Sequence, residues 1–416
     1  MDSLTPRPYD SIDSLTQRPN RPIDPLTPRL KIHLIAAARP NFMKIAPLYH
    51  ALKKEDWAKP HIVHTGQHYD LNMSDAFFRD LRLPDPDFHL GVGSGTHAEQ
   101  TGRVMMAYEK LLLQEKPDFV IVVGDVNSTL ACALATTKIC FTQIIKPSSL
   151  PAGQPPTYSG HRPLLAHLEA GLRSFDRSMP EEINRIVTDS LSDILWTPSP
   201  DADENLRREG IPDEKIIRVG NIMIDSLEML REEIQRQQMC KQLGLRDKDY
   251  AVVTLHRPSN VDTPVVLESI CDSLVQISKK IRIVFPVHPR TRKNLISFGF
   301  IRQLEETPGI LLTEPVNYIR FMSLIFDCRF VLTDSGGIQE ETTYLGIPCL
   351  TLRPNTERPI TVEQGTNKLT TPAKMVKDAD TILCADTFSS HVPELWDGRT
   401  AQRIIESIKE ISGWTY

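Results

Sequence analysis

The sequence predicts an α/β protein with two doubly wound parallel-sheet domains that face each other across a cleft. From Lys31 onward, short β-branched runs alternate with amphipathic stretches, which is the pattern of parallel βα units. The alternation starts again after Gly220 and Asn221, and polar side chains follow the expected strands in both halves. With 416 residues, the chain has room for two domains of ordinary size.

The first 30 residues form an internal repeat with a period of 11. A motif of the form Asp-Ser/Pro-Leu-Thr begins at Asp2, Asp13 and Asp24, and prolines are frequent around it. So few apolar side chains cannot bury enough surface to offset the entropy lost on folding. We therefore expect residues 1–30 to be a disordered Pro-rich tail.

Residues 31–222 are expected to form the first domain. Its strands are expected at Ile32–Ala36, Ile62–His64, Phe119–Val123, Leu164–Leu168, Ile194–Thr197 and Ile216–Val219. The clearest helices between them are Ala98–Glu115 and Ser128–Ile139. Cys140–Pro163 is rich in proline and far longer than a tight link between a helix and a strand. We predict that 140–163 is an inserted surface loop, for which a role as a lid or an interface is a hypothesis.

Residues 223–395 are expected to form the second domain. Its strands are expected at Ala251–Leu255, Ile281–Pro286, Ile310–Leu312, Phe330–Leu332 and Pro348–Leu352. Val265–Lys279 and Tyr318–Phe326 are the clearest helices here. The last helix, about Arg399–Ser412, carries isoleucines on one face. We expect the segment 396–416 to cross back and complete the first domain.

Composition excludes several classes of protein. The 48 basic and 53 acidic residues nearly balance, so nothing favours a nucleic acid or an anionic membrane as partner. No apolar run approaches the ~20 residues that span a bilayer, and the N-terminus lacks the apolar core of a signal peptide. The seven cysteines are scattered, so we expect buried reduced thiols and no metal site. A soluble cytoplasmic protein is predicted.

The segment from Phe330 to Glu341 carries the strongest functional signal. An apolar strand runs into Asp-Ser-Gly-Gly, and a helix is expected to start at once. Two glycines permit a tight turn, and the free N–H groups of the new helix favour a phosphate. Glu340 and Glu341 suit the hydroxyl groups of a ribose beside that phosphate. The alternative is a plain strand-turn-helix corner whose acids complement the helix dipole.

Side chains that can take part in chemistry lie at the expected carboxyl ends of strands in both halves. Ligands of open parallel sheets bind at that edge. The residues are Arg39, His68, Asp125, Glu169, His256, Arg257, His288, Asp334 and Ser335. Taken singly, each has a structural alternative, such as a helix cap for Asp125 or a packed ring for His256.

A carboxylate pair, Glu181 and Glu182, stands at the start of a helix. Proline at the first helical position followed by acids is ordinary capping, so the structural interpretation explains the pair by itself. Arg173 and Arg185 are candidates to pair with these acids.

Together these motifs resemble those of the non-hydrolysing UDP-N-acetylglucosamine 2-epimerases, which have the GT-B fold of two Rossmann-like domains. The resemblance extends from Lys31 to the C-terminus. Its motifs in the first half are Ala38–Pro47, Thr65–His68, Gly95–Thr101, Gly124–Asp125, His167–Arg173 and Pro180–Arg185. Those in the second half are Thr254–Arg257, Pro286–Pro289, Asp334–Glu341 and Thr356–Pro359.

The resemblance implies reversible C2 epimerisation of UDP-N-acetylglucosamine to UDP-N-acetylmannosamine, through elimination of UDP to a 2-acetamidoglucal and its re-addition. The residues that it implies are catalytic are Asp125, Glu169, Glu181 and His256. Those that it implies bind UDP or the sugar are Arg39, Lys44, Arg185, Ser335, Gly336, Gly337, Glu341 and Arg358. Gln67, His68 and Arg257 match positions linked to a second, activating substrate molecule. No cofactor and no metal are implied.

Other interpretations stay open at this point. A GT-B glycosyltransferase would share the fold and the UDP site but would need an acceptor. A 2-epimerase could also act on a modified UDP-N-acetylhexosamine, and a non-catalytic UDP-sugar sensor would not need the acids. The expected partners are a UDP-sugar and a second copy of the chain in a homodimer, and the natural setting is cell-surface polysaccharide biosynthesis.

Overall fold

The structure is a computed structural model that describes residues 29–66, 78, 80–144, 158–385 and 391–413. The predicted tail at residues 1–30 lies almost wholly outside the described residues. The same is true of Gln67 and His68 and of the middle of the predicted insertion.

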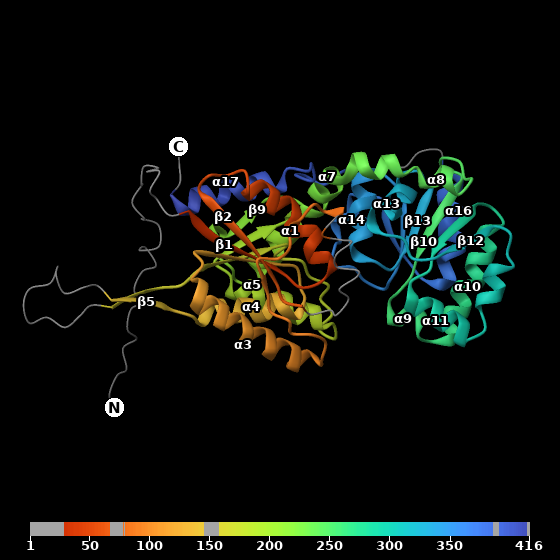
Figure 1. Cartoon of the computed structure of the whole chain (residues 1–416). Coiled ribbons are helices and arrows are strands. Elements are labelled where there is room, and N and C mark those ends of the chain that lie inside the picture. The colour runs from red at the N-terminus through yellow and green to blue at the C-terminus, as the bar shows by residue number, and fades with distance from the viewer. Residues whose placement is uncertain (1–28, 67–77, 79, 145–157, 386–390, 414–416) are drawn as a thin grey trace, which may run out of the picture.

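The first lobe is built around a parallel sheet that has seven strands in the described part of the chain, in the order β3-β2-β1-β4-β7-β8-β9. Its strands are β1 (Leu30–Ala36), β2 (Ala58–His64), β3 (Phe88–His89), β4 (Phe119–Val123), β7 (Leu164–Leu168), β8 (Ile194–Thr197) and β9 (Ile216–Arg218). Helices cover both faces of the sheet (Figure 1). Strands β4, β7 and β8 have the predicted bounds, whereas the two-residue β3 is not predicted.

The helices of this lobe are α1 (Arg39–Leu52), α3 (His97–Glu115), α4 (Asn127–Lys138), α5 (Pro180–Leu191) and α6 (Pro200–Arg208). Helix α3 begins with a capping box: the hydroxyl of Thr96 accepts from the N–H of Glu99 (3.3 Å), and the Glu99 carboxylate accepts from the N–H of Thr96 (3.0 Å). Helices α1, α4 and α5 follow β1, β4 and β7, so their first turns meet at the carboxyl edge of the sheet.

The predicted insertion is more regular than a loop at both of its ends. Phe141–Ile144 (β5) and Tyr158–His161 (β6) pair in antiparallel fashion, and this ribbon projects from the first lobe (Figure 1). Phe141 is buried in the core beside β4, which anchors the ribbon. The prediction of a plain loop is therefore wrong for these strands, because the prolines between them dominate the sequence pattern. Residues 145–157 lie outside the described residues.

The second lobe is built around a parallel sheet with the order β12-β11-β10-β13-β14-β15, six strands within the described ranges. Its strands are β10 (Tyr250–Thr254), β11 (Arg282–Pro286), β12 (Ile310–Thr313), β13 (Phe330–Thr333), β14 (Cys349–Leu352) and β15 (Asn367–Thr370). Its helices are α8 (Met239–Gln242), α9 (Pro258–Val261), α10 (Pro264–Ser278), α11 (Pro289–Ser297), α12 (Ile301–Glu305), α13 (Tyr318–Phe326), α14 (Gly336–Leu345), α15 (Ile360–Glu363) and α16 (Pro372–Cys384). Two parallel α/β sheets confirm the predicted fold class.

The helix α7 (Ile222–Gln237) contacts α1 of the first lobe and α13 and α14 of the second, and α17 (Thr400–Ser412) is the last helix of the described chain. Asp225 on α7 accepts from the N–H groups of Thr400 (3.1 Å) and Ala401 (2.8 Å), which caps the start of α17. Ser407 on α17 accepts from the indole N–H of Trp196 on β8 (3.0 Å). The last helix therefore packs on the first lobe (Figure 1), while the predicted domain boundaries stay a prediction.

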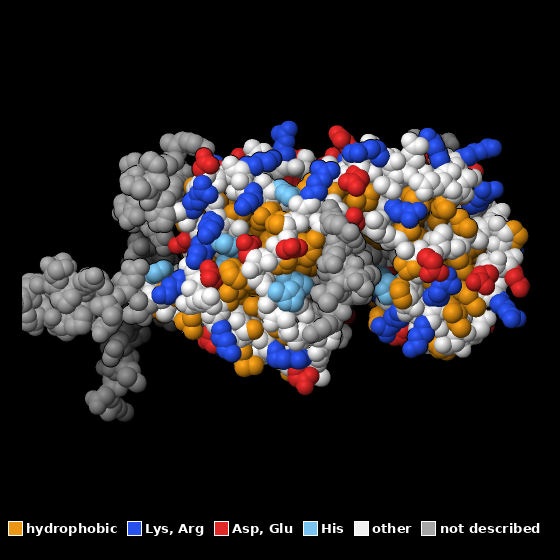
Figure 2. All heavy atoms as spheres, viewed as in Figure 1, with side chains coloured by type: hydrophobic (Ala, Val, Ile, Leu, Met, Phe, Trp, Pro, Cys, Tyr) orange, Lys and Arg blue, Asp and Glu red, His pale blue; other side chains and the backbone are white. Residues whose placement is uncertain are grey.

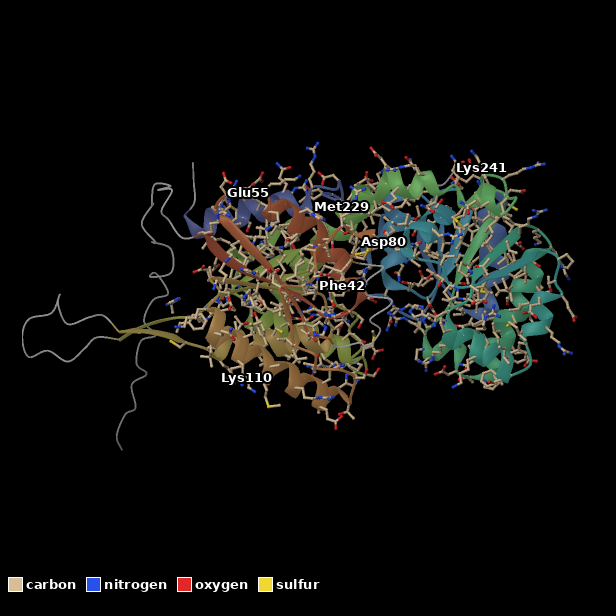
Figure 3. The ribbon with its side chains drawn as sticks, viewed as in Figure 1. Phe42, Glu55, Asp80, Lys110, Met229 and Lys241 are labelled. Carbon is tan, nitrogen blue, oxygen red and sulfur yellow. The ribbon has the colours of Figure 1, made fainter. Side chains whose placement is uncertain are left out.

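Side chains also bridge the lobes directly. Asn317 Nδ2 donates to Oδ2 of Asp80 (3.3 Å), and Figure 3 labels Asp80 at the junction between the lobes. Asn221, just before α7, donates through Nδ2 to Oε1 of Glu340 on α14 (2.9 Å). These contacts hold the two carboxyl edges opposite each other.

Charge on the surface is mixed, with Lys and Arg interspersed among Asp and Glu over the face visible in Figure 2. Among the described residues, no helix has the length and apolar character needed to cross a membrane. All seven cysteines are free; five are buried as predicted, whereas Cys140 and Cys384 are exposed. The prediction of a buried thiol is wrong for these two: Cys140 lies between α4 and β5, and Cys384 is the last residue of α16.

Candidate active site

A cavity of about 840 Å³ lies between the two lobes. The first lobe contributes α1, the loop after β4 and the start of α5, and the second contributes the loops after β10, β12 and β14 and the start of α14. Most of these lie at carboxyl ends of parallel strands, where ligands of doubly wound sheets bind. The predicted residues that line the cavity are Lys44, Asp125, Glu181, Arg185, His256, Arg257, Ser335, Gly336, Gly337, Glu341 and Arg358.

The start of α14 offers an anion-binding site. The helix begins at Gly336, and the side chain of the extended N-cap residue, Ser335, makes no capping bond. A Cβ on Gly336 would lie 2.8 Å from both Arg358 Nη1 and Glu357 Oε1, so glycine lets this ion pair approach the helix. The first N–H groups of a ten-residue helix thus lie at the cavity with an arginine beside them, which suits a phosphate.

Arg358 lies at the centre of a buried ion network. Its Nε is 2.8 Å from Oε1 of Glu340, and its Nη1 is 2.6 Å from Oε1 of Glu357, which also pairs with Arg353 (2.8 Å). Burial by itself lowers the pKa of Arg358, but the charges of Glu340 and Glu357 raise it above its usual range. Burial by itself raises the pKa of Glu357, yet the two arginines hold it well below its usual range. The guanidinium of Arg358 therefore stays charged and fixed beside the anion site.

His256 follows β10 at the same edge of the sheet. Its Nδ1 is 2.9 Å from Oδ1 of Asp334, and its ring centroid is 5.7 Å from that of His288. Burial raises the pKa of Asp334, but the hydrogen bonds from His256 and from the N–H of Arg257 outweigh burial and lower it. The acid behind His256 is thus a carboxylate.

Glu340 and Glu341 are adjacent on α14 and have different surroundings. Oε1 of Glu340 accepts from Asn221, while its Oε2 has no hydrogen-bond partner among the described residues. Glu341 accepts from the hydroxyl of Tyr318 (2.7 Å), and burial raises its pKa to about 7. Near neutral pH the Glu341 carboxyl group can both donate and accept a hydrogen bond, as the paired hydroxyl groups of a ribose require.

Arg185 on α5 joins two acids of the first lobe. Its Nη1 donates to Oδ2 of Asp125, and its Nη2 is 2.6 Å from Oε2 of Glu182. The buried Glu182 also accepts from the N–H of Ser174 (3.0 Å), so it closes the loop before α5. Glu181 is half-buried and lines the cavity together with Asp125. Of the neighbouring pair, Glu182 supports the loop and Glu181 is available to a ligand.

Glu169 lies deeper than the other predicted acids. It is 4% exposed, and its φ of +72° is in the left-handed region that non-glycine residues rarely adopt. Its Oε2 pairs with Lys44, and its Oε1 has no hydrogen-bond partner within the described structure. Strained backbone and an unpartnered buried oxygen are typical of functional sites. Lys44 lines the cavity and Glu169 does not, so the structure connects Glu169 to the cavity through Lys44.

Three predicted residues cannot be placed in the cavity. Gln67 and His68 lie outside the described residues, as does the side chain of Arg39, the first residue of α1. Arg257 lines the cavity, and its N–H donates to Oδ2 of Asp334 (2.8 Å). The activating site implied by Gln67, His68 and Arg257 stays a prediction.

Arg173 does not pair with Glu181 or Glu182, so that prediction is wrong. Its Nη2 pairs instead with Asp189 (2.7 Å) and with Glu209 (2.6 Å). Asp189 also holds Nδ1 of the buried His167 (2.6 Å). Arg173 therefore belongs to a network of ion pairs and hydrogen bonds with Asp189 and Glu209. The pattern of residues at the helix start could not reveal these pairs, because the partners are distant in sequence.

The sequence assigns no role to some other residues at the cavity. Met43, Met179 and Tyr318 line it. Methionine and tyrosine side chains are often part of a core, so their residue type does not separate these three from the core. Glu357 lies in the motif Thr356–Pro359, for which the resemblance implies a role only for Arg358.

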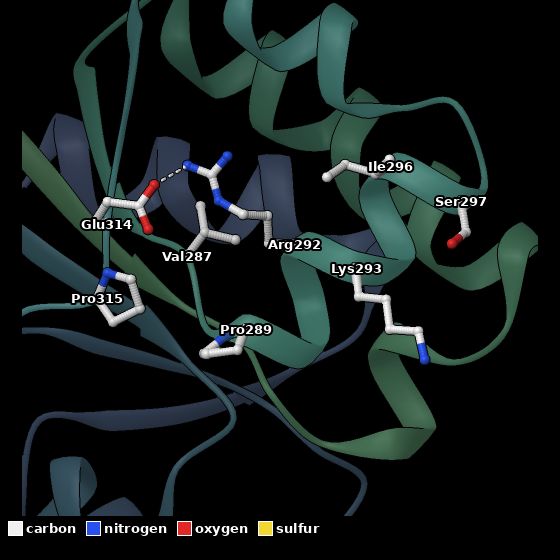
Figure 4. Close-up of a pocket in the computed structure, with 8 residues that line it drawn as sticks. All are labelled: Val287, Pro289, Arg292, Lys293, Ile296, Ser297, Glu314 and Pro315. Carbon is white, nitrogen blue, oxygen red and sulfur yellow. Dashed lines mark hydrogen bonds and ion pairs between the residues drawn. The ribbon is translucent and has the colours of Figure 1, made fainter. Parts of the chain in front are cut away.

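A second cavity, of about 460 Å³, lies between α11 and the residues that follow β11 and β12 (Figure 4). Arg292 on α11 pairs with Glu314 beside it (2.6 Å), and none of the predicted site residues lines it. Within the described ranges, no group of His, Cys, Asp and Glu side chains has an arrangement that could hold a metal ion.

Comparison with known proteins agrees with the geometry of the larger cavity. A family model described as UDP-N-acetylglucosamine 2-epimerase matches residues 50–141 and 160–409. The UDP-N-acetylglucosamine 2-epimerase of Methanocaldococcus jannaschii is 42% identical over 363 residues, which are 85% of this chain and 92% of that protein. The UDP-2,3-diacetamido-2,3-dideoxy-D-glucuronate 2-epimerase of Pseudomonas aeruginosa is 39% identical over 92% of this chain and 100% of its own.

A solved structure shares the arrangement of both lobes. The crystal structure of M. jannaschii UDP-GlcNAc 2-epimerase in complex with UDP-GlcNAc and UDP superposes with a TM-score of 0.78 at 39% identity. The match covers 91% of this chain and 99% of that one, and confirms the GT-B type of the fold. The chain therefore belongs to the UDP-N-acetylglucosamine 2-epimerase family, and it is an isomerase that acts at C2 of a UDP-linked sugar.

Proposed function

We propose that this enzyme interconverts UDP-N-acetylglucosamine and UDP-N-acetylmannosamine by eliminating UDP and adding it back to a 2-acetamidoglucal. The observation that carries the proposal is the cavity between the lobes, where acids of the first lobe lie opposite His256 and the start of α14. This path needs a carboxylate for the C2 proton, positive charge around UDP, and a cavity that holds both fragments.

The second lobe holds UDP in this proposal. The N–H groups at Gly336 and Gly337 bind a phosphate together with the guanidinium of Arg358, because all three lie at the anion site described above. Glu341 binds the ribose hydroxyls. The hydroxyl of Ser335 and the cations of the first lobe (Arg39, Lys44 and Arg185) complete the surroundings of the sugar diphosphate.

The elimination breaks the C2–H bond and the C1–O bond. A carboxylate takes the C2 proton, the C–H electrons form the C1=C2 double bond, and the C1–O electrons leave with the UDP oxygen. His256 stabilises the charge on the departing diphosphate. Re-addition reverses these steps and delivers a proton to the opposite face of C2, so an acid/base group is needed on each face.

Asp125 and Glu181 are the proposed acid/base pair. Both line the cavity, and they come from different elements, the loop after β4 and the start of α5. Arg185 orients Asp125 through their ion pair. Glu169 completes the proposed catalytic group by holding the ammonium group of Lys44.

Incubation with UDP-N-acetylglucosamine in D₂O, without any acceptor, tests the proposal. NMR should show UDP-N-acetylmannosamine and deuterium at C2. Asp125→Asn and Glu181→Gln should each lower kcat by about 10²-fold, with UDP affinity by calorimetry little changed, because neither residue belongs to the UDP site. No epimer and no deuterium would leave a transferase or a sensor, and near-normal kcat in both variants would place the base elsewhere.

A second candidate is epimerisation of a modified UDP-N-acetylhexosamine. It is favoured by the 39% identity to the P. aeruginosa enzyme, whose name specifies a diacetamido uronate. Measurement of kcat/KM for UDP-N-acetylglucosamine and for UDP-2,3-diacetamido-2,3-dideoxyglucuronate separates the two, because the preferred substrate has the higher value.

The proposal includes a cytoplasmic homodimer that supplies a cell-surface polysaccharide pathway. Sedimentation equilibrium should give twice the 47.1 kDa of one chain. A single-chain mass across the concentration range would contradict the dimer.

A further inference from the structure

Asp334 is a buried acid of the cavity edge to which the mechanism above gives no role. It follows β13 and is 0% exposed. Thr333 of β13 is paired with Thr254 of β10, so the residues that follow these two strands meet at one edge. His256 is the residue that Asp334 meets there.

Both oxygens of Asp334 accept hydrogen bonds. Oδ2 accepts from the N–H of His256 (3.0 Å), the N–H of Arg257 (2.8 Å) and Nδ2 of Asn260 (3.1 Å). Oδ1 lies 2.9 Å from Nδ1 of His256. The carboxylate is therefore fixed by backbone and side-chain donors, and it cannot rotate away from the imidazole without losing them.

A carboxylate offers no hydrogen, so the proton in its contact with the imidazole sits on Nδ1 of His256. Nε2 is then the ring nitrogen that remains for a ligand. The side chain of His256 is 42% exposed and lines the cavity, whereas that of Asp334 is fully buried. One edge of the ring is held by the protein and the other faces the substrate space.

We propose that Asp334 is a positioning residue that keeps a proton on Nδ1 of His256 and directs Nε2 toward the departing diphosphate. The inference rests on the proposed function, in which His256 acts on UDP. When the C1–O electrons pass to the UDP oxygen, a protonated Nε2 donates a hydrogen bond to the new charge, and Asp334 balances the imidazolium. On re-addition the same contact holds the UDP oxygen for its attack on C1.

The tautomer of His256 in the unmodified enzyme is the first test. Ligand-free protein labelled with ¹⁵N-histidine is compared with His256→Gln to assign the signal of His256. At mildly alkaline pH, Nδ1 should carry the hydrogen and Nε2 should be the unprotonated nitrogen. An unprotonated Nδ1 would overturn the inference, and this measurement does not depend on any Asp334 variant folding.

A double-mutant cycle is the second test. Asp334→Asn keeps the shape but removes the charge, so it should lower kcat by about 10²-fold, with the KM for UDP-N-acetylglucosamine within about threefold. Because Asp334 acts through His256, adding Asp334→Asn to His256→Gln should lower kcat by no more than about twofold. Losses that multiply in the double variant would indicate a structural role and overturn the inference.

Asp378→Asn is the matched control. Asp378 is a buried acid of the same lobe that holds Lys368 (2.6 Å) and Thr370 (2.7 Å) and does not line the cavity. Its kcat should stay near that of the wild type. Full activity of His256→Gln would defeat the role that the proposed function gives to His256. An impaired His256→Gln with a fully active Asp334→Asn would defeat the inference alone.

Discussion

Adjacent acids at the helix starts around this cavity have different partners and different roles. Glu182 holds Ser174 and Arg185, whereas Glu181 beside it lines the cavity. Glu340 pairs with Arg358, whereas Glu341 meets the hydroxyl of Tyr318. Consecutive side chains on a helix point in directions about 100° apart, so adjacent acids at a helix start meet different partners.

Glu341 gives the stability of the protein a pH dependence of known sign. Burial raises its pKa from 4.5 to about 7, so between these values the folded chain binds a proton that the unfolded chain releases. Its contribution is therefore most favourable at low pH and is lost as the pH rises through about 7. Glu341→Gln should raise the free energy of unfolding near pH 8 by on the order of 2 kcal/mol, with a smaller effect near pH 5.

Urea denaturation of ligand-free protein at both pH values measures this difference. Tyr318 keeps an acceptor in the variant, because the amide oxygen of glutamine replaces a carboxylate oxygen. A gap between the two proteins that is the same at both pH values would rule out titration of Glu341 as its cause.

The residues at strand ends predict where the site lies, but they do not predict which side chains reach the cavity and which are buried behind it. Strand ends mark Asp125, His256 and Arg257, and all three line the cavity. Glu169 follows the same rule, yet it lies behind Lys44, because depth depends on packing between segments far apart in sequence. Asp334 was marked by position only, since its bond to His256 depends on the register of two strands.

At the element scale, helix starts build the site. Helices α5 and α9 begin with proline, which fixes the first turn, whereas α14 begins with two glycines. Proline is suited to a helix start whose backbone nothing has to approach closely. Glycine suits a start that an ion pair and a phosphate must both approach.

Alanine substitutions at the two glycines of α14 should therefore differ. In Gly336→Ala the new Cβ would lie 2.8 Å from atoms of Glu357 and Arg358, so the ion pair must move and UDP affinity should fall by roughly tenfold. At Gly337 a Cβ meets nothing within 4 Å, so Gly337→Ala should lose less. Calorimetric titration with UDP compares them, and equal losses would refute the explanation from close contact.

Elements with strong apolar patterns could be predicted with their bounds. Phe119–Val123 and Tyr318–Phe326 match β4 and α13. The missed strand β15 has only one large apolar residue, Leu369, and β3 has two residues in all. These short strands depend on pairing with a neighbour already in place, which a local pattern cannot report.

At the scale of the whole molecule, two sheets of the same class face each other with the cavity between them. The restart of the βα pattern after Asn221 predicts this division. The direct contacts between the lobes, such as Asn317 with Asp80, join residues 237 positions apart and have no signal in the sequence.

The repeat at the N-terminus should be dispensable for catalysis. Removal of residues 1–29 should leave kcat within about twofold and Tm within about 2 °C, because the segment has too little apolar surface to stabilise a core. Steady-state kinetics and a thermal melt of the shortened and full chains check this. A marked fall in Tm would mean that the segment packs on one of the lobes.

The bond between Trp196 and Ser407 also sets the order in which the protein can be completed. It joins positions 211 residues apart, and Ile404 and Ile408 of the same helix belong to the core of the first lobe. During translation, the first lobe is synthesised early, but part of its hydrophobic core stays exposed until α17 has emerged from the ribosome. A premature stop before α17 would therefore destabilise the first lobe, although every other element of that lobe would be present.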